Sequence, residues 1–446
     1  MNPSALAIDH VFQVLDKLPA PRHYWVAYSG GVDSTALLFL LSHNREKLPA
    51  PLVAVHVNHQ LSANAGRWEQ HCRAFCRERD IRFESITIHV LDGRNGSVET
   101  QARELRYAAL EGCMHEGDVL LTAHHLDDQA ETVIQQLLRG GGPEGLAAIP
   151  EIRRFGPGWL ARPLLEYDRG RLEDYVKMNQ LGWVEDESNA DQGMDRNYIR
   201  NTIMPCIKSR WPSAAQVLWR VSRLQADAAS ILNDMAGHDL AQAAGRPPAI
   251  LSLSALRSLA LPRQRNLLRY WIRNNGHPVP AMEVINEMIR ELIHARPDGM
   301  PCIRWGDTEI RRYRDEVHIL PAVPDLPAVG TCLWSLHTPL PVNGGSLEAR
   351  KTIGSGLRAD RLQDDKVEVR FRRGGERIRP AGRKETHELK KLFQDYSLPP
   401  WERDSVPLLY VGDELAAVAG YWIAEGFNAT GKEQGWDIVF LRGRRD

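Results

Sequence analysis

Two kinds of apolar pattern alternate along roughly the first 140 residues. Short apolar runs of strand length are each followed by a longer segment whose apolar residues recur at helical spacing. The strand-like runs are 24–28, 52–57, 82–90 and 119–123, and the helix-like segments are 34–41, 64–79, 98–114 and 129–138. Such repetition predicts a doubly wound α/β domain, with a parallel sheet and helices on both faces. Its ligand site should lie beyond the carboxyl ends of the strands.

The pattern changes after this domain. Residues 214–293 are rich in helical spacing, as at Leu267, Leu268, Trp271 and Ile272, and 321–345 is rich in Pro and Gly. Later segments predict a small α+β module: an alternating strand at Val367, Val369 and Phe371, a short helix at Leu389, Leu392 and Phe393, and strands 406–411 and 415–419 around a turn. We therefore predict a catalytic α/β domain, a helical domain, a linker and an α+β domain, at 1–213, 214–321, 322–350 and 351–446.

Composition narrows the class of protein. The chain has 446 residues, 43% of them hydrophobic and 25% charged, which is typical of a folded multidomain protein. Its net charge of −1 means that a nucleic-acid partner must be held by a local basic patch. The six cysteines form no disulfide framework, and no stretch approaches the ~20 apolar residues of a membrane span. The first residues read as a short helix with Ile8, Val11, Phe12 and Leu15 on one face, so we expect a cytoplasmic protein.

A glycine-rich loop lies between the first strand and its helix, with the sequence SGGVDS. It consists of Ser29, Gly30, Gly31, Val32, Asp33 and Ser34. Glycines let the backbone turn tightly against a phosphate, and the helix N-terminus supplies free N–H groups. The loop has no lysine, so it is not a Walker loop, and transfer of a γ-phosphate is disfavoured. The loop resembles the pyrophosphate-binding loop of the ATP pyrophosphatases, which cleave ATP between its α and β phosphates.

Acidic and histidine residues follow the fourth strand in the segment HHLDDQAET. Asp128 and Glu131 are three apart on a helix and share a face, so they can hold Mg²⁺ against ATP phosphates. Capping of the helix is the alternative role for these acids and for Asp127. His124 and His125 are candidates to orient an RNA, with a structural role as the alternative.

Two arginine pairs complete the predicted site. Arg103 and Arg106 share a helix face beside Tyr107 and suit an RNA phosphate or the carbonyl of an extruded base, whereas Tyr107 itself is better explained by core packing. Arg196 and Arg200 also share a helix face and suit ATP phosphates or the carboxylate of an amino acid. Small residues at 140–145 predict a mobile lid or an RNA-facing loop.

The C-terminal module has an unusual density of basic residues. Nine cations lie in a short window: Arg370, Arg372, Arg373, Arg377, Arg379, Arg383, Lys384, Lys390 and Lys391. Such a surface suits an RNA backbone, and a solvated charged face is the alternative.

Taken together, these motifs resemble the longer tRNA(Ile)-lysidine synthases, a family of ATP pyrophosphatases. The resemblance rests on the loop and on segments 56–61, 102–107, 122–132, 162–164, 186–189, 196–201, 374–380, 389–394 and 399–403. It implies that ATP adenylates the wobble cytidine in the CAU anticodon of tRNA(Ile), and that free lysine then displaces AMP. The modified tRNA changes from methionine to isoleucine identity. The rivals are a tRNA thiolase with the same loop, and a non-catalytic nucleotide- or RNA-binding relative.

The resemblance and the residue chemistry together give a set of predicted roles. The catalytic residues are Asp33, Arg103, Arg106, Asp128 and Glu131, with Asp128 and Glu131 as the metal ligands. ATP is bound by the loop, Arg196 and Arg200, and tRNA by His124, His125, Arg370, Arg372, Arg373, Arg377, Arg379, Lys390 and Lys391. Asp33 acts either as a base toward the lysine amine or only to position Mg²⁺. Beyond tRNA and lysine, a homodimer is the one partner left open.

Overall fold

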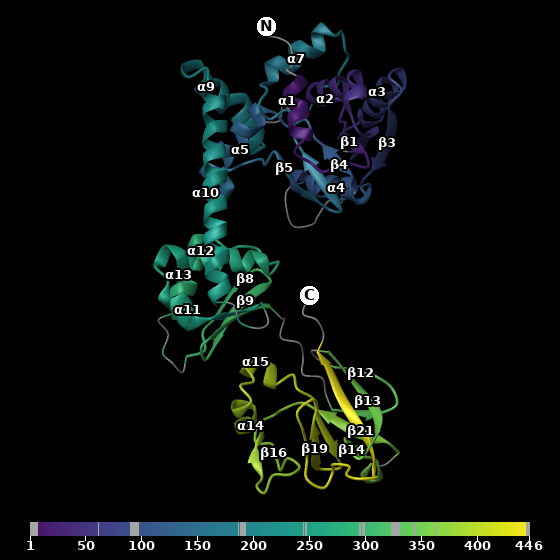
Figure 1. Ribbon diagram of the computed structural model, residues 1–446, viewed down its shortest axis with the longest axis vertical. Coiled ribbons are helices and arrows are strands. Elements are labelled where there is room, and N and C mark those ends of the chain that lie inside the picture. Colours follow the sequence, from purple (N-terminus) through teal and green to yellow (C-terminus); the bar gives the residue numbers. More distant parts are fainter. Residues whose placement is uncertain are drawn as a thin grey trace. The chain divides into compact units, whose positions relative to one another are not determined.

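The structure is a computed structural model in which contacts divide the chain into two compact units, Met1–Leu232 and Asn233–Asp446 (Figure 1). It describes residues 8–60, 62–89, 98–185, 187, 193–243, 245, 248–293, 296, 299–322, 331–342, 345–362 and 364–442. Parts of the predictions lie outside these residues: Leu61, Val90, Asp186, Ser188, Asn189 and the linker positions 323–330 and 343–344. No described helix is long and apolar enough to cross a membrane.

The first unit is built on a six-stranded sheet of order β3-β2-β1-β4-β6-β5. Its strands are β1 (Tyr24–Ala27), β2 (Leu52–Asn58), β3 (Arg82–Thr87), β4 (Val119–Leu121), β5 (Ile152–Phe155) and β6 (Gly158–Ala161). Every pairing is parallel except that of the β5–β6 hairpin at the edge. The predicted doubly wound parallel sheet is therefore confirmed. The edge hairpin was not predicted.

Helices cover both faces of this sheet. They are α1 (Ile8–Leu15), α2 (Val32–His43), α3 (Ala65–Glu78), α4 (Val98–Gly112), α5 (Leu126–Leu138), α6 (Pro143–Leu146), α7 (Arg169–Met178), α8 (Asp195–Tyr198) and α9 (Met204–Arg210), with a short 3₁₀ helix at Arg45–Lys47 and a π-helical turn at Ile199–Ile203. Successive strand residues point to opposite faces. Val26 thus packs with α1, α2 and α7 in one core, whereas Trp25 packs with Leu110 of α4 in the other.

Two helices begin earlier than the apolar pattern predicted, and both shifts bear on the site. Helix α2 begins at Val32 and α5 at Leu126, so Gly31 of the loop and His125 become helix N-caps. The first turns of both helices contain polar residues, so apolar residues do not recur there at helical spacing. The apolar pattern therefore missed these first turns. Within the glycine-rich 140–145 segment, α6 is a helical turn, and its movement remains a prediction.

The second unit contains helices, as predicted, together with an antiparallel sheet that was not predicted. The helices are the end of α10 (Ala214–Ala243), which begins in the first unit, then α11 (Leu253–Ser258), α12 (Leu261–Asn274) and α13 (Met282–Met288), followed by a π-helical turn at Ile289–Ile293. The sheet, of order β7-β10-β9-β8, comprises β7 (Ile250–Ser252), β8 (Cys302–Trp305), β9 (Thr308–Tyr313) and β10 (Glu316–Pro321). Leu267, Leu268, Trp271 and Ile272 of α12 are buried between them.

The C-terminal module is α+β, as predicted. One sheet has the order β11-β15-β18-β19-β20 and another β12-β13-β21-β14. The elements are β11 (Cys332–Ser335), β12 (Leu340–Val342), β13 (Gly345–Ile353), β14 (Leu357–Arg358), a 3₁₀ helix (Ala359–Arg361), β15 (Lys366–Arg370), β16 (Arg377–Ile378), β17 (His387–Glu388), α14 (Leu389–Asp395), α15 (Pro400–Arg403), β18 (Leu408–Val411), β19 (Glu414–Val418), β20 (Trp422–Ile423) and β21 (Gln434–Arg442). Strands β11 and β12 fall in the predicted linker, yet they pair with β15 and β13.

Candidate active site

The glycine-rich loop takes the tight path that the sequence predicts. Gly30 has φ +84°, and a Cβ placed there would lie 2.8 Å from Cys72 Sγ, so only glycine fits without strain. Gly31 is the N-cap of α2 and leaves the first N–H groups of that helix free for an anion. The Ser34 hydroxyl donates to Gly31 O at 3.0 Å and lies 3.1 Å from the Ser29 hydroxyl. The loop is therefore preformed for a phosphate.

A cavity of about 1090 Å³ opens at the carboxyl ends of the parallel strands, as the fold predicts. Its lining brings together the loop, the end of β2, α4, the segment after β4, α8, and Arg200 of the π-helical turn that follows α8. The predicted residues on this lining are Ser29, Gly31, Val32, Asp33, Ser34, Arg103, Arg106, His124, Asp128, Arg196 and Arg200. Tyr107, Trp183 and Glu187 line it as well. Side chains from segments more than 160 residues apart thus share one site.

Asp128 and Glu131 of α5 face Arg196 of α8 and Arg200 of the π-helical turn that follows it. Asp128 Oδ1 accepts hydrogen bonds of 2.8 Å from both Arg196 and Arg200. Glu131 accepts from Arg200 Nε at 2.7 Å and from Arg196 Nε at 3.2 Å. Burial opposes ionisation of Asp128, but His125 and the arginines outweigh it and hold its pKa well below the usual range. We name Asp128, Glu131, Arg196 and Arg200 the four-charge cluster.

The four-charge cluster does not fit a Mg²⁺ ion as arranged here. Mg²⁺ requires free oxygen ligands in near-octahedral geometry, but the facing oxygens of Asp128 and Glu131 already accept from guanidiniums. The described residues also contain no group of three or more His, Cys, Asp or Glu suited to a metal. In this arrangement the pair that was predicted to bind a metal instead stabilises Arg196 and Arg200.

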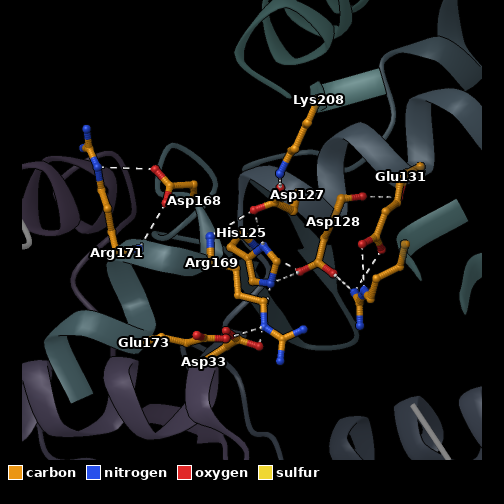
Figure 2. A network of polar contacts seen from close by, with 12 residues as sticks. Asp33, His125, Asp127, Asp128, Glu131, Asp168, Arg169, Arg171, Glu173 and Lys208 are labelled. Atoms are coloured by element: carbon orange, nitrogen blue, oxygen red, sulfur yellow. Dashed lines mark hydrogen bonds and ion pairs between the residues drawn. The ribbon is translucent and has the colours of Figure 1, made fainter. Parts of the chain in front are cut away.

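His125 lies at the centre of a second set of carboxylates (Figure 2). Its Nε2 is 3.7 Å from Asp33 Oδ2 and 3.4 Å from Asp128 Oδ2, and its Nδ1 is 3.9 Å from Asp127 Oδ2. The side chain is 3% exposed. Burial alone would lower the pKa of His125, but Asp128, Asp33 and Asp127 raise it above its usual value. His125 therefore links the loop to α5, and its predicted contact with RNA stays a prediction.

His124 has the opposite electrostatic environment. Burial, reinforced by Arg162, Arg196 and Arg106 and only partly opposed by Asp128, lowers the pKa of His124 to about 3. Its Nδ1 lies 2.9 Å from the Thr122 hydroxyl, and the side chain lines the cavity. His124 is thus neutral near pH 7. Its predicted contact with RNA stays a prediction.

The raised pKa of His125 predicts a pH-dependent contribution to stability. Because the pKa of His125 is higher in the folded than in the unfolded protein, its charge stabilises the fold. This stabilisation is fully present below the unfolded-state pKa, near 6.5, and is lost as pH rises through the folded-state pKa. Replacing His125 by Asn should therefore lower the free energy of unfolding of the first unit more at pH 6 than at pH 9. Urea unfolding of wild type and variant at the two pH values measures this. An equal loss at both would mean that His125 is not charged in the folded protein.

Arg103, Arg106 and Tyr107 form a basic wall of the cavity, and sequence reasoning missed Arg162, which interacts with Tyr107. The guanidiniums of Arg103 and Arg106 lie 5.4 and 5.7 Å from the Tyr107 ring centroid. Burial raises the pKa of Tyr107, but Arg103, Arg162 and Arg106 outweigh it and give a net lowering. Arg162, which is 4% exposed, was the residue missed; the segment 162–164 had been noted only as a resemblance. Tyr107 also packs in the core against Phe155 as predicted, with ring centroids 5.9 Å apart.

Family models match three parts of the chain. A PP-loop domain matches residues 5–207, a TilS substrate binding domain 251–318, and a TilS substrate C-terminal domain 367–440. The three matches fall within the three predicted domains, whose boundaries remain predictions. A tRNA(Ile)-lysidine synthase of Coxiella burnetii is 39% identical over 432 residues, covering 96% of each chain. One from Methylococcus capsulatus is 40% identical and covers 93% of this chain and 96% of its own.

The chain belongs to the tRNA(Ile)-lysidine synthase family. Among solved structures, a U34-tRNA thiolase from Methanococcus maripaludis is 19% identical with a TM-score of 0.40, covering 49% of this chain and 78% of that chain. A TILS C-terminal domain, also 19% identical, has a TM-score of 0.21 and covers 26% of this chain and all of that chain.

The basic residues of the C-terminal module divide into two groups within this member of the family. Arg370 and Arg372 are half-buried and paired, with Glu368 at 2.5 Å and with Asp404 at 3.3 Å. The other basic residues are exposed and, in the described part of the chain, make no ion pair: Arg373, Arg377, Arg379, Arg383, Lys384, Lys390 and Lys391. We name these seven the basic surface. Arg370 and Arg372 are less available to RNA than the sequence suggested.

Two cysteines of α3, Cys72 and Cys76, are unsuited to sulfur chemistry. Cys72 and Cys76 are fully buried beside the loop, and burial raises the pKa of both, to about 12 for Cys76. A thiol with a raised pKa is a poor nucleophile and a poor metal ligand. The thiolase alternative is not favoured, because the curated relatives that match over most of the chain are tRNA(Ile)-lysidine synthases.

Proposed function

We propose that this chain joins lysine to the wobble cytidine of the CAU anticodon of tRNA(Ile), using ATP and releasing pyrophosphate and AMP. The observation that carries the proposal is the identity of about 40% with tRNA(Ile)-lysidine synthases over nearly the whole chain. The preformed loop at the mouth of a cavity large enough for two nucleotides supports it. The substrate is a tRNA, so we place the reaction in the cytoplasm.

In the first step, the O2 oxygen of the cytidine attacks the α-phosphorus of ATP, and pyrophosphate leaves. The free N–H groups at the start of α2, with Ser29 and Ser34, hold the departing phosphates. We propose that Mg²⁺ arrives with the triphosphate, where it would neutralise phosphate charge, and we assign no step to it. Arg103 and Arg106 are placed to bind the extruded nucleotide, because the cavity wall that they form is basic.

In the second step, the ε-amine of lysine attacks C2 of the adenylated base, and AMP leaves with the former O2. Free lysine carries both ammonium and carboxylate groups, so its site must present both signs of charge. The four-charge cluster does so on the cavity lining, with Asp128, Arg196 and Arg200 in contact with it. We propose that lysine exchanges with ion pairs of this cluster. Asp33, whose Oδ1 is buried and unpaired in the described residues, remains a candidate base for the lysine amine.

Transfer of labelled lysine tests the proposal. Purified protein, ATP and labelled lysine should label a tRNA(Ile) transcript with a CAU anticodon, with one AMP and one pyrophosphate formed per lysine. The elongator methionine tRNA, which has the same anticodon, is the matched control and should stay almost unlabelled. Pyrophosphate release without tRNA, or labelling that needs a sulfur donor in place of lysine, would overturn the proposal.

A further inference from the structure

A buried arginine joins two parts of the second unit that are distant in sequence. Arg403 of α15 is 5% exposed. Its Nε donates to Leu398 O at 2.8 Å, and its Nη2 donates to the Tyr313 hydroxyl of β9 at 3.0 Å. A guanidinium is costly to bury unless its hydrogen bonds are satisfied, and here a residue of β9 satisfies one of them. Arg403 therefore depends on Tyr313 for a partner.

Trp401, two residues before Arg403, contacts both strands of the β9–β10 hairpin. Its ring centroid lies 6.2 Å from that of Tyr313 and 5.2 Å from that of His318, both in edge-to-face geometry. The guanidinium of Arg311 lies 5.4 Å from the Trp401 ring. Aromatic and cation–π contacts of this kind add to the burial of apolar area and favour one relative orientation of the groups. Three residues of β9 and β10 thus hold one tryptophan of α15.

The turn between β9 and β10 makes a third contact, with α14. Arg314 adopts a left-handed conformation, with φ +55°. Its guanidinium donates to the Ser397 hydroxyl at 2.5 Å and to Gln394 O at 2.7 Å. Gln394 lies in the last turn of α14, and its carbonyl also accepts from the backbone N–H of Ser397 at 3.0 Å. Arg314 therefore adds a side-chain donor from the hairpin to the end of the helix that carries Lys390 and Lys391 of the basic surface.

We propose that Arg314, Tyr313, Trp401 and Arg403 form a joint that locks the C-terminal module onto the β9–β10 hairpin, and thereby fixes the basic surface in the position that binds tRNA. The contribution to tRNA binding rests on the proposed function, whereas the locking itself does not. Phosphate contacts fix the register of a protein on a folded RNA only if the contacting side chains are held in place. Loosening the joint should then weaken tRNA binding without touching a single exposed cation of that surface.

Two variants of the full-length chain test the joint. Tyr313→Phe removes the hydroxyl partner of Arg403, and Arg314→Ala removes the two hydrogen bonds from the hairpin to Gln394 O and the Ser397 hydroxyl. Combined in one protein, the two substitutions should broaden the distance distribution in small-angle X-ray scattering and raise the KM for tRNA about tenfold. The kcat at saturating tRNA and the KM for ATP should stay unchanged. Arg361→Ala, which removes an exposed arginine on the 3₁₀ helix Ala359–Arg361, is the matched control and should alter neither.

The two readouts separate failure of the joint from failure of the proposed function. A scattering profile identical to that of wild type, with an unchanged KM, would overturn the joint. Broadened scattering with an unchanged KM would show that the joint exists but does not serve tRNA binding, which overturns that half of the proposal. If the wild-type chain does not modify tRNA at all, the proposed function fails, and scattering still decides whether the joint locks the module.

Discussion

Replacing Glu131 by Ala should reduce tRNA-dependent ATP–pyrophosphate exchange by about a thousandfold. The reason is the part that Glu131 plays in the four-charge cluster. Glu131 is 2% exposed and accepts from both Arg196 and Arg200, so its removal leaves two half-buried guanidiniums that retain Asp128 as a partner but lose their fixed position. Removing one preorganised electrostatic group from an active site typically costs about 2.7–4 kcal/mol of transition-state stabilisation, which is a factor of roughly 10²–10³ in rate.

Asp33→Ala should cause a loss of similar order through the loop itself. Its carboxylate is held beside His125, and Oδ1 is left unpaired in the described residues. Asp174→Asn, at an exposed acid on α7, is the control for both variants. Circular dichroism and tRNA binding show whether the variants fold, and Glu131→Gln retains the shape of the side chain if Glu131→Ala does not fold. Near-normal exchange in a folded variant would remove that residue from the adenylation machinery.

Neutralising the basic surface should have the second largest effect, this time on tRNA binding. Replacing Arg377, Arg379 and Lys390 by Ala should raise the KM for tRNA by at least about tenfold and leave kcat nearly unchanged. Each cation that contacts a phosphate releases counterions. The slope of log binding constant against log salt concentration should therefore become shallower, by up to the amount expected for about three phosphate contacts. The measurement is lysine transfer against tRNA concentration at two ionic strengths.

The paired arginines provide the control for that measurement. Glu368 holds Arg370, and Asp404 lies next to Arg372, so Arg370→Ala should alter the salt slope less than Arg377→Ala. Point substitutions are preferable to removal of residues 351–446, because that deletion would remove β15, the partner strand of β11, and would cut through β13. An unchanged KM together with an unchanged salt slope would mean that the basic surface is a solvated face.

The sequence predicted the catalytic fold well, because apolar period and strand length are local properties. The four strands from Tyr24 to Leu121 and their helices follow from that period. The short strands around β9 and the pairing of β11 with β15 did not follow, because strands of four to six residues acquire their identity from partners distant in sequence. Proline and glycine around β11 were read as a linker for the same reason.

The candidate site shows the same limit at the level of single residues. The loop and the arginines were found because each lies in a dense local motif, and the structure brings them to one cavity. The contacts of Glu131 with Arg200 and of His125 with Asp33 were not predicted, because these partners are 69 and 92 residues away. Spacing on one helix shows which carboxylates share a face, but it does not show which cations will meet them.

The most direct test of the central claim follows one oxygen atom. A tRNA(Ile) carrying ¹⁸O at the O2 position of the wobble cytidine is incubated with the protein, ATP and lysine, and the AMP released is analysed by mass spectrometry. Attack of O2 on the α-phosphorus, followed by displacement at C2, predicts one ¹⁸O in each AMP and none in the modified nucleoside. Unlabelled AMP, or AMP that takes up ¹⁸O from labelled lysine carboxylate instead, would contradict adenylation of the cytidine.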